Sequence, residues 1–234
     1  HILIKGENHY MRALNYFLLV IEFAQPYSNN PESNPGLPIK LDSNPDPSTL
    51  PKSRSTVAEV YDQIVKDLQE SISLLTLEAG ETPKNNNFVT KEAAEALLAR
   101  VYLYMGKTEE AAQMADNVIK SDRFELEQGE RYAKYAQWLP ENNKETIFAV
   151  RMVKEKDSND DFGSLYIQAD GSGWEEIYPS NPFLQLMELH LDENHMPLDL
   201  RSRYITKRYV EDGVTDYAVY GHPERKYNNW TFVY

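Results

Sequence analysis

The sequence predicts a mainly α-helical protein that combines helical hairpins with long irregular loops and a few short strands. Apolar residues recur at intervals of three and four over four segments within the first 121 residues, which is the period of amphipathic helices. More than half of the 13 prolines lie between residues 26 and 51, where they exclude regular helix. After about residue 125 the helical period weakens, and Tyr and Val alternate with charges.

The first helix is predicted over residues 7–23. Its expected apolar side consists of Tyr10, Ala13, Leu14, Phe17, Leu18 and Ile21. The proline-rich loop at 25–55 follows, and loops of this length are usually functional or disordered. Leu37, Ile39 and Leu41 alternate within it. We therefore expect this loop to be irregular but ordered, with these side chains anchored on the helical surface.

Three further helices are predicted over 56–75, 91–105 and 108–121. Thr56 and Glu59 form a capping box at the start of the second helix, and the third helix starts after Thr90. Gly106 occupies the position of a left-handed C-terminal cap. We expect Leu98 and Tyr102 to be buried and Thr108 to cap the fourth helix, whose apolar face is Ala111, Ala112, Ala115, Val118 and Ile119.

The hairpin formed by the third and fourth helices resembles a tetratricopeptide unit. The residues that carry this resemblance are Leu98, Ala99, Tyr102, Ala111 and Ala115. It implies an α/α superhelix. We divide the chain into a helical scaffold over 1–125 and a loop-rich part over 126–234 of the same overall domain. In the second part we expect a strand at 146–153 and a helix that starts at Asn181-Pro182, with Asn181 as its cap, and is lined by Phe183, Leu186, Met187 and His190.

Charge and composition exclude several classes. The formal charge is −13, from 24 basic and 37 acidic residues, so no nucleic-acid partner is expected. There is no cysteine, which removes disulfides, thiol nucleophiles and thiolate metal sites. No apolar run reaches the roughly 18–20 residues of a membrane-spanning helix. The chain starts at His1 without a signal peptide, and we interpret it as a fragment or a processed chain.

No stretch of the sequence has the residue spacing of a known catalytic, metal-binding or cofactor-binding motif. The acidic stretch from Asp157 to Asp161 resembles a calcium loop, but its glycine and its twelfth position do not match an EF-hand. His190 and His195 are five residues apart, not the four of a zinc protease helix. Serine does not occur in a Gly-x-Ser-x-Gly elbow. We therefore expect no enzyme activity, no metal and no cofactor.

Aromatic residues in polar stretches are the best candidates for a ligand site. Tyr166, Trp174 and Tyr178 flank a glycine-containing segment without helical period, and Trp230 follows two asparagines. A Trp on a loop is either a plug over a core or a stacking platform for a ligand ring. We predict that the first three contribute to a shallow sugar-binding face and that Trp230 is a weaker candidate.

Several stretches resemble, in order, the SusD/RagB family of outer-membrane nutrient-binding proteins. Gly6-Glu7 and residues 11–17 are similar to the signature of the family's early helix. Gly36-Leu37-Pro38-Ile39 is similar to the Gly-x-Pro-hydrophobic motif that follows it. The run 93–104 resembles the family most closely. The remaining matches are Arg54-Ser55-Thr56-Val57, Val60-Tyr61, Ile64, Asp67-Leu68, 143–148, Pro179-Ser180, Asp199 and Arg201.

The resemblance implies a non-catalytic, surface-exposed lipoprotein that captures oligosaccharides and passes them to a TonB-dependent (SusC-like) transporter in the outer membrane. Family members are longer at both ends, so it also implies that the lipid anchor lies in an N-terminal region missing from this chain. A peptide-binding nutrient-uptake protein of the same family is the first alternative. A helical-repeat scaffold for protein partners is the second.

Overall fold

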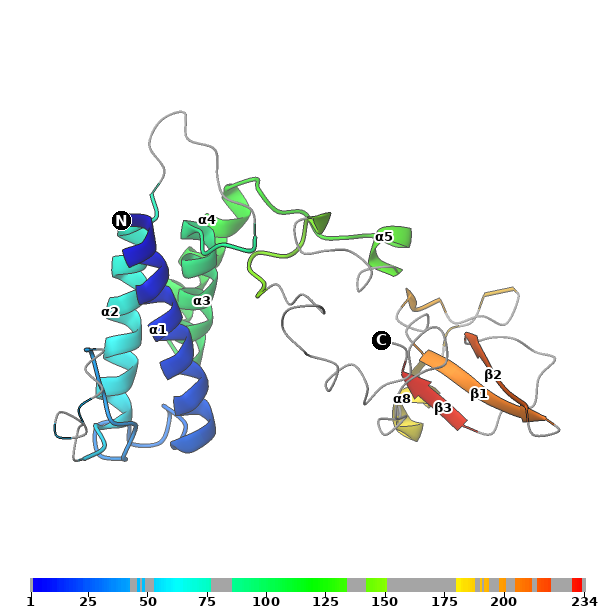
Figure 1. The fold of residues 1–234 in the computed structure, drawn as a ribbon, viewed down its shortest axis with the longest axis horizontal. Helices are drawn as coiled ribbons and strands as arrows, with labels where there is room; N and C mark the ends of the chain where they lie inside the picture. The colour runs from blue at the N-terminus through cyan, green and yellow to red at the C-terminus, as the bar shows by residue number, and fades with distance from the viewer. Residues whose placement is uncertain are drawn as a thin grey trace. The chain divides into compact units, whose positions relative to one another are not determined.

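The chain divides into two compact units in a computed structural model (Figure 1). The first unit contains residues 1–126 and 140–150, and the second contains 127–139 and 151–234. The structure describes residues 2–42, 46, 48, 53–76, 86–133, 142–150, 180–187, 190, 192–193, 198–200, 205–211, 214–219 and 229–232. The prediction that both parts belong to one overall domain stays a prediction.

Four helices form the first unit: α1 (Ile2–Phe23), α2 (Val57–Leu74), α3 (Lys91–Tyr104) and α4 (Thr108–Lys120). Helix α1 packs on α2, α2 also packs on α3, and α3 packs on α4 (Figure 1). These spans confirm the mainly α fold and all four predicted helices, although α1 begins five residues earlier than its apolar period indicated. The helical pairs form the expected hairpins.

Local sequence signals account for three of the helix ends. Thr56 and Glu59 form the complete capping box before α2, and the Thr90 side chain accepts from the amide of Ala93 before α3. Gly106 has φ +75°, the left-handed region that favours glycine. The Thr108 prediction is wrong. The carbonyl of Lys107 already accepts from the amide of Ala111, so Lys107 is the N-cap and Thr108 is the first helical residue.

The core of the first unit lies between α1, α2 and α3. Phe17, Ile64, Leu68 and Leu98 are almost fully buried there, and Tyr102 packs half-buried against the core. Several predicted core residues are exposed, however, because no described element covers their side of the helix. On α1 these are Leu18 and Ile21, and on α4 they are Ala112 and Ile119.

The described part of the proline-rich loop is irregular, as predicted. Leu37 is buried and Ile39 packs partly against the core, but Leu41 is exposed. Two of the three alternating side chains therefore anchor the loop on the helices, and the third does not. The expected strand at 146–153 is wrong for its described residues, 146–150. These residues pair with the loop before α3 instead, because the amide of Ala149 donates to the carbonyl of Asn86. Phe148 packs edge-on against Tyr10.

The second unit contains α5 (Gly129–Ala133), α8 (Asn181–Met187) and an antiparallel sheet. Its strands are β1 (Ile205–Glu211), β2 (Val214–Val219) and β3 (Asn229–Phe232), in the order β2-β1-β3. The expected short strands are therefore present. Helix α8 is capped one residue earlier than predicted, since the Ser180 hydroxyl accepts from the amide of Phe183. Met187 is buried as expected, whereas Leu186 is exposed and His190 lies beyond the helix.

Candidate functional site

The predicted aromatic site falls mainly on residues that the structure does not describe. Tyr166, Trp174 and Tyr178 lie outside the described residues. Trp230 lies in β3, where its backbone is opposite Lys207 of β1. The structure therefore places one of the four candidates, Trp230, on a sheet. They stay predictions.

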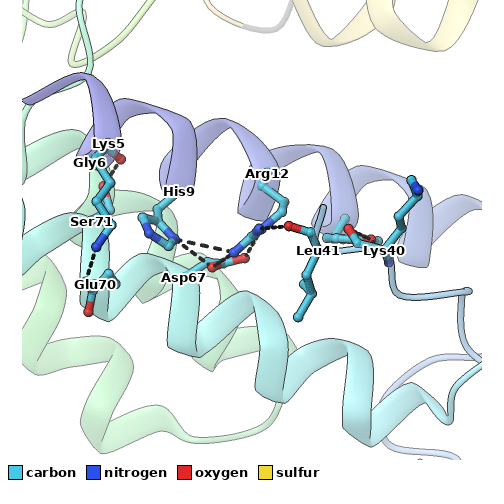
Figure 2. Close-up of polar contacts among 10 residues, drawn as sticks. Lys5, Gly6, His9, Arg12, Lys40, Leu41, Asp67, Glu70 and Ser71 are labelled. Atoms are coloured by element: carbon cyan, nitrogen blue, oxygen red, sulfur yellow. Dashed lines mark hydrogen bonds and ion pairs between the residues drawn. The ribbon is translucent and has the colours of Figure 1, made fainter. Parts of the chain in front are cut away.

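The best-defined polar site in the described residues lies between α1 and α2 (Figure 2). Asp67 projects from α2 and has only 2% side-chain exposure. One of its carboxylate oxygens accepts from Arg12 Nη2 at 2.5 Å and contacts His9 Nδ1 at 2.9 Å. The other oxygen accepts from Arg12 Nε at 2.8 Å. Arg12 thus binds the carboxylate with two guanidinium nitrogens, Nε and Nη2, and such bidentate pairs are among the strong hydrogen-bonded ion pairs.

The charge state of Asp67 follows from these contacts. Burial by itself would raise the pKa of the carboxyl. The hydrogen bonds from Arg12, His9 and Gln63 outweigh that effect, and the pKa of Asp67 is below its ordinary value. The pairing also raises the pKa of Arg12. Asp67 is therefore a stable anion at neutral pH, unsuited to general acid catalysis.

The contacts of α1 continue from this pair to the proline-rich loop. Arg12 Nη1 donates to the carbonyl of Leu41 at 3.2 Å. One helical turn further, the Tyr16 hydroxyl donates to the carbonyl of Lys40 at 3.0 Å and accepts from the amide of Lys40 at 2.7 Å. Figure 2 shows residues 40 and 41 beside these side chains. Side chains of α1 therefore hold the middle of the proline-rich loop through the loop's backbone.

Arg54, near the C-terminal end of the same loop, holds the part of the loop that follows α1. Arg54 Nε donates to the carbonyl of Gly36 at 2.5 Å, and Arg54 Nη2 donates to the carbonyls of Phe23 at 2.8 Å and Pro35 at 3.1 Å. Gly36 also lies against the backbone of Thr56: a Cβ at residue 36 would approach the Thr56 oxygen to 2.6 Å. These contacts satisfy carbonyls that an irregular loop leaves without regular partners.

The polar contacts between α1 and α2 are structural in kind. Within the described part of the chain, no group of three or more His, Cys, Asp or Glu residues is placed to hold a metal ion. Asp67, Arg12 and His9 satisfy one another, and none of them is a nucleophile that a neighbouring base activates. The site can therefore orient the proline-rich loop against α1, but its geometry supports no reaction.

Sequence reasoning did not identify this group. The available signal was Asp67 itself, an acid on the apolar face of α2 between Ile64 and Leu68. A buried carboxylate requires a cationic partner. The spacing of His9 and Arg12 places them one turn apart on α1, but nothing in the sequence aligns that turn with Asp67.

No helix in the described residues is long and apolar enough to cross a membrane.

Comparison with known proteins identifies the class to which this fold belongs. A SusD-like family model, described as starch-binding and associating with the outer membrane, matches residues 2–103. A SusD superfamily protein of Bacteroides thetaiotaomicron is 35% identical, with a TM-score of 0.59 over 67% of this chain and 33% of that one. Another from Bacteroides vulgatus is 25% identical, with a TM-score of 0.68 over 98% and 50%. Among curated proteins, none matches this chain.

A further structure from Bacteroides vulgatus belongs to a protein described as sugar-binding. It is 28% identical, with a TM-score of 0.65 over 86% of this chain and 42% of that one. The chain belongs to the SusD/RagB family, as its ordered motifs indicated. It spans between a third and a half of the length of these three solved structures.

Proposed function

We propose that this chain is part of a non-catalytic cell-surface protein that binds oligosaccharides. The observation that carries this proposal is the match of residues 2–103 to a family described as starch-binding and associating with the outer membrane. A relative described as sugar-binding, 28% identical to the chain, supports the same ligand class. The absence of a catalytic motif in the sequence agrees with binding without turnover.

In this proposal the loop aromatics Tyr166, Trp174 and Tyr178 provide the contact surface, with Trp230 as a weaker contributor. Sugar rings have apolar C–H faces that stack on aromatic rings, and their hydroxyls require polar partners. The segment between the first three aromatics, Gln168-Ala169-Asp170-Gly171-Ser172-Gly173, offers amide, carboxylate and hydroxyl groups. An aromatic surface with such neighbours suits an oligosaccharide.

The wider role in this proposal is nutrient uptake. The protein would be held at the outer membrane by a lipid anchor and would deliver its ligand to a TonB-dependent transporter. Both statements rest on the family resemblance. The description of the matching family as associating with the outer membrane supports the location. Copurification of the full-length protein with a TonB-dependent transporter would test the partnership.

Calorimetry with maltoheptaose on the full-length protein tests the ligand class. We expect Trp174→Ala to weaken binding by about tenfold, since stacking on one aromatic is worth about 1–3 kcal/mol and a factor of ten corresponds to about 1.4 kcal/mol. Its melting temperature should stay that of the unchanged protein. Trp230→Ala is the comparison variant and should have the smaller effect.

Other results would contradict this assignment. Binding of a peptide mixture but of no oligosaccharide would favour a peptide-uptake protein of the same family. A Trp174→Ala variant that melts several degrees lower with unchanged affinity would identify Trp174 as a core plug. Release of shorter sugars, abolished by one Asp or Glu substitution, would overturn the non-catalytic assignment.

A further inference from the structure

Helices α1 and α3 end, and α2 begins, at the same end of the helical unit (Figure 1). Four aromatic residues from these segments are in ring contact there. Phe17 of α1 lies at the centre and is 2% exposed. Its ring is edge-on to Tyr61 of α2 at 6.3 Å and to Tyr104 of α3 at 5.2 Å between centroids. Tyr27, which follows α1, is edge-on to Tyr61 at 4.9 Å. We call Tyr27, Tyr61 and Tyr104 the tyrosine cluster.

The hydroxyls of the tyrosine cluster have no hydrogen-bond partner among the residues that the structure describes. This is most notable at Tyr61, which is 3% exposed. Buried tyrosines usually pair their hydroxyl. On this unit the half-buried Tyr16 pairs with Lys40 and the half-buried Tyr102 accepts from Gln69 at 3.4 Å, whereas the buried Tyr10 has no such partner among the described residues.

The cluster reaches the surface through Tyr104 and Tyr27, and the hydroxyls of Tyr61 and Tyr27 stay protonated at neutral pH. Tyr104 is 50% exposed and Tyr27 is half-buried. Burial, followed by the neighbouring Tyr104 and Tyr27, raises the pKa of Tyr61 to about 12. Burial and the carboxylates of Asp62 and Glu32 raise the pKa of Tyr27. The cluster therefore presents neutral hydroxyl donors and acceptors beside two carboxylates that only accept.

We propose that the tyrosine cluster is a second carbohydrate-binding site, on the helical unit and separate in sequence from the loop aromatics. A sugar ring combines apolar C–H faces with hydroxyls that donate and accept, which matches aromatic rings, phenol hydroxyls and flanking carboxylates. The choice of a carbohydrate as the ligand rests on the proposed function. A ligand with an ammonium group could bind the aromatic rings by cation–π contact and the carboxylates by charge. An ammonium group only donates hydrogen bonds, however, so the tyrosine hydroxyl protons would have no acceptor on that ligand.

Fluorine NMR on the full-length protein labelled with 3-fluorotyrosine tests this site directly. The Tyr27, Tyr61 and Tyr104 signals are assigned by Tyr→Phe substitution, and maltoheptaose is added to the Trp174→Ala background. We expect the Tyr61 and Tyr104 signals to shift with sugar concentration. Tyr61→Phe, which removes only the unpartnered hydroxyl, should weaken this site by about two- to tenfold. Its melting temperature should not change.

The matched control is Tyr102→Phe, which removes a hydroxyl that already has a partner on the same unit and should leave sugar affinity unchanged. Signals that do not shift in a protein that binds maltoheptaose overturn the second site and leave the proposed function standing. A shift with tetramethylammonium but not with maltoheptaose reassigns the cluster to a cationic ligand. Absence of maltoheptaose binding in every variant and in the unchanged protein contradicts both proposals.

Discussion

Helices α1 and α2 pack against each other, but their apolar residues relate differently to burial. On α2 the residues Val57, Val60, Tyr61, Ile64 and Leu68 all lie in the core. On α1 the core positions are Tyr10, Ala13, Phe17 and Val20, while other large apolar side chains are exposed: Ile2, Ile4, Met11, Leu18, Leu19, Ile21 and Phe23. Because α2 lies between α1 and α3, its apolar face is covered, whereas described neighbours cover only one side of α1. A helical period therefore predicts a face but not whether that face has a partner.

The largest expected effect comes from comparing neighbours on α1. Phe17→Ala should lower the free energy of unfolding by about 3–5 kcal/mol, because it leaves a cavity where α1, α2 and α3 meet. Leu18→Ala should change it by less than about 0.5 kcal/mol, since that side chain is 50% exposed. Chemical denaturation of both variants measures the difference. Equal losses would mean that the outer side of α1 is as tightly covered as the inner side.

The polar pair between α1 and α2 should give the next largest effect. Asp67→Asn leaves Arg12 without its buried anion, and we expect a loss of about 3 kcal/mol, at the low end for a broken buried pair because the Arg12 side chain keeps 29% exposure. Glu70→Gln on the same helix is the control. Its pair with Lys5 is exposed on both sides and is worth less than about 1 kcal/mol. Similar values for the two variants would contradict the burial of Asp67.

Acid should act through the same carboxyl. The pKa of Asp67 is lowered in the folded chain, so its stabilising contribution is complete above the ordinary value of about 4 and is lost as pH falls through the lower folded pKa. Unfolding curves between pH 7 and pH 2 should therefore converge for the unchanged protein and Asp67→Asn. A stability difference that persists undiminished at pH 2 would argue against this linkage.

The smallest expected effect comes from comparing the start of α2, which has a side-chain cap, with the start of α4, which has none. Thr56→Ala removes the hydroxyl that accepts from the Glu59 amide at 3.2 Å, and it should cost about 1 kcal/mol. Thr108→Ala should cost less than half of that, because Lys107 caps α4 without a side-chain bond. Thermal melts of the two variants provide the measurement. The reverse order would indicate that Thr108 has a role that its position does not suggest.

The sequence by itself determined the four helices of the first unit and the family. The helices followed from apolar spacing, from Thr56, Thr90 and Gly106, and from prolines that exclude helix between α1 and α2. These are local effects, because propensity, capping and φ restrictions act within a few residues. The same locality explains the wrong cap predictions at Thr108 and Asn181, where neighbouring residues compete for one cap position and a difference of one residue decides the outcome.

Only the tertiary structure decided which side chains meet. Asp67 pairs with Arg12 and His9 across more than 50 positions, the Tyr16 hydroxyl holds Lys40, and the tyrosine cluster joins three separate segments. It also left Leu18 and Ile119 exposed on faces that looked like core. The physical reason is that periodicity records which residues share a helical face. What lies opposite that face depends on how the helices align and pack, and no local pattern encodes that alignment.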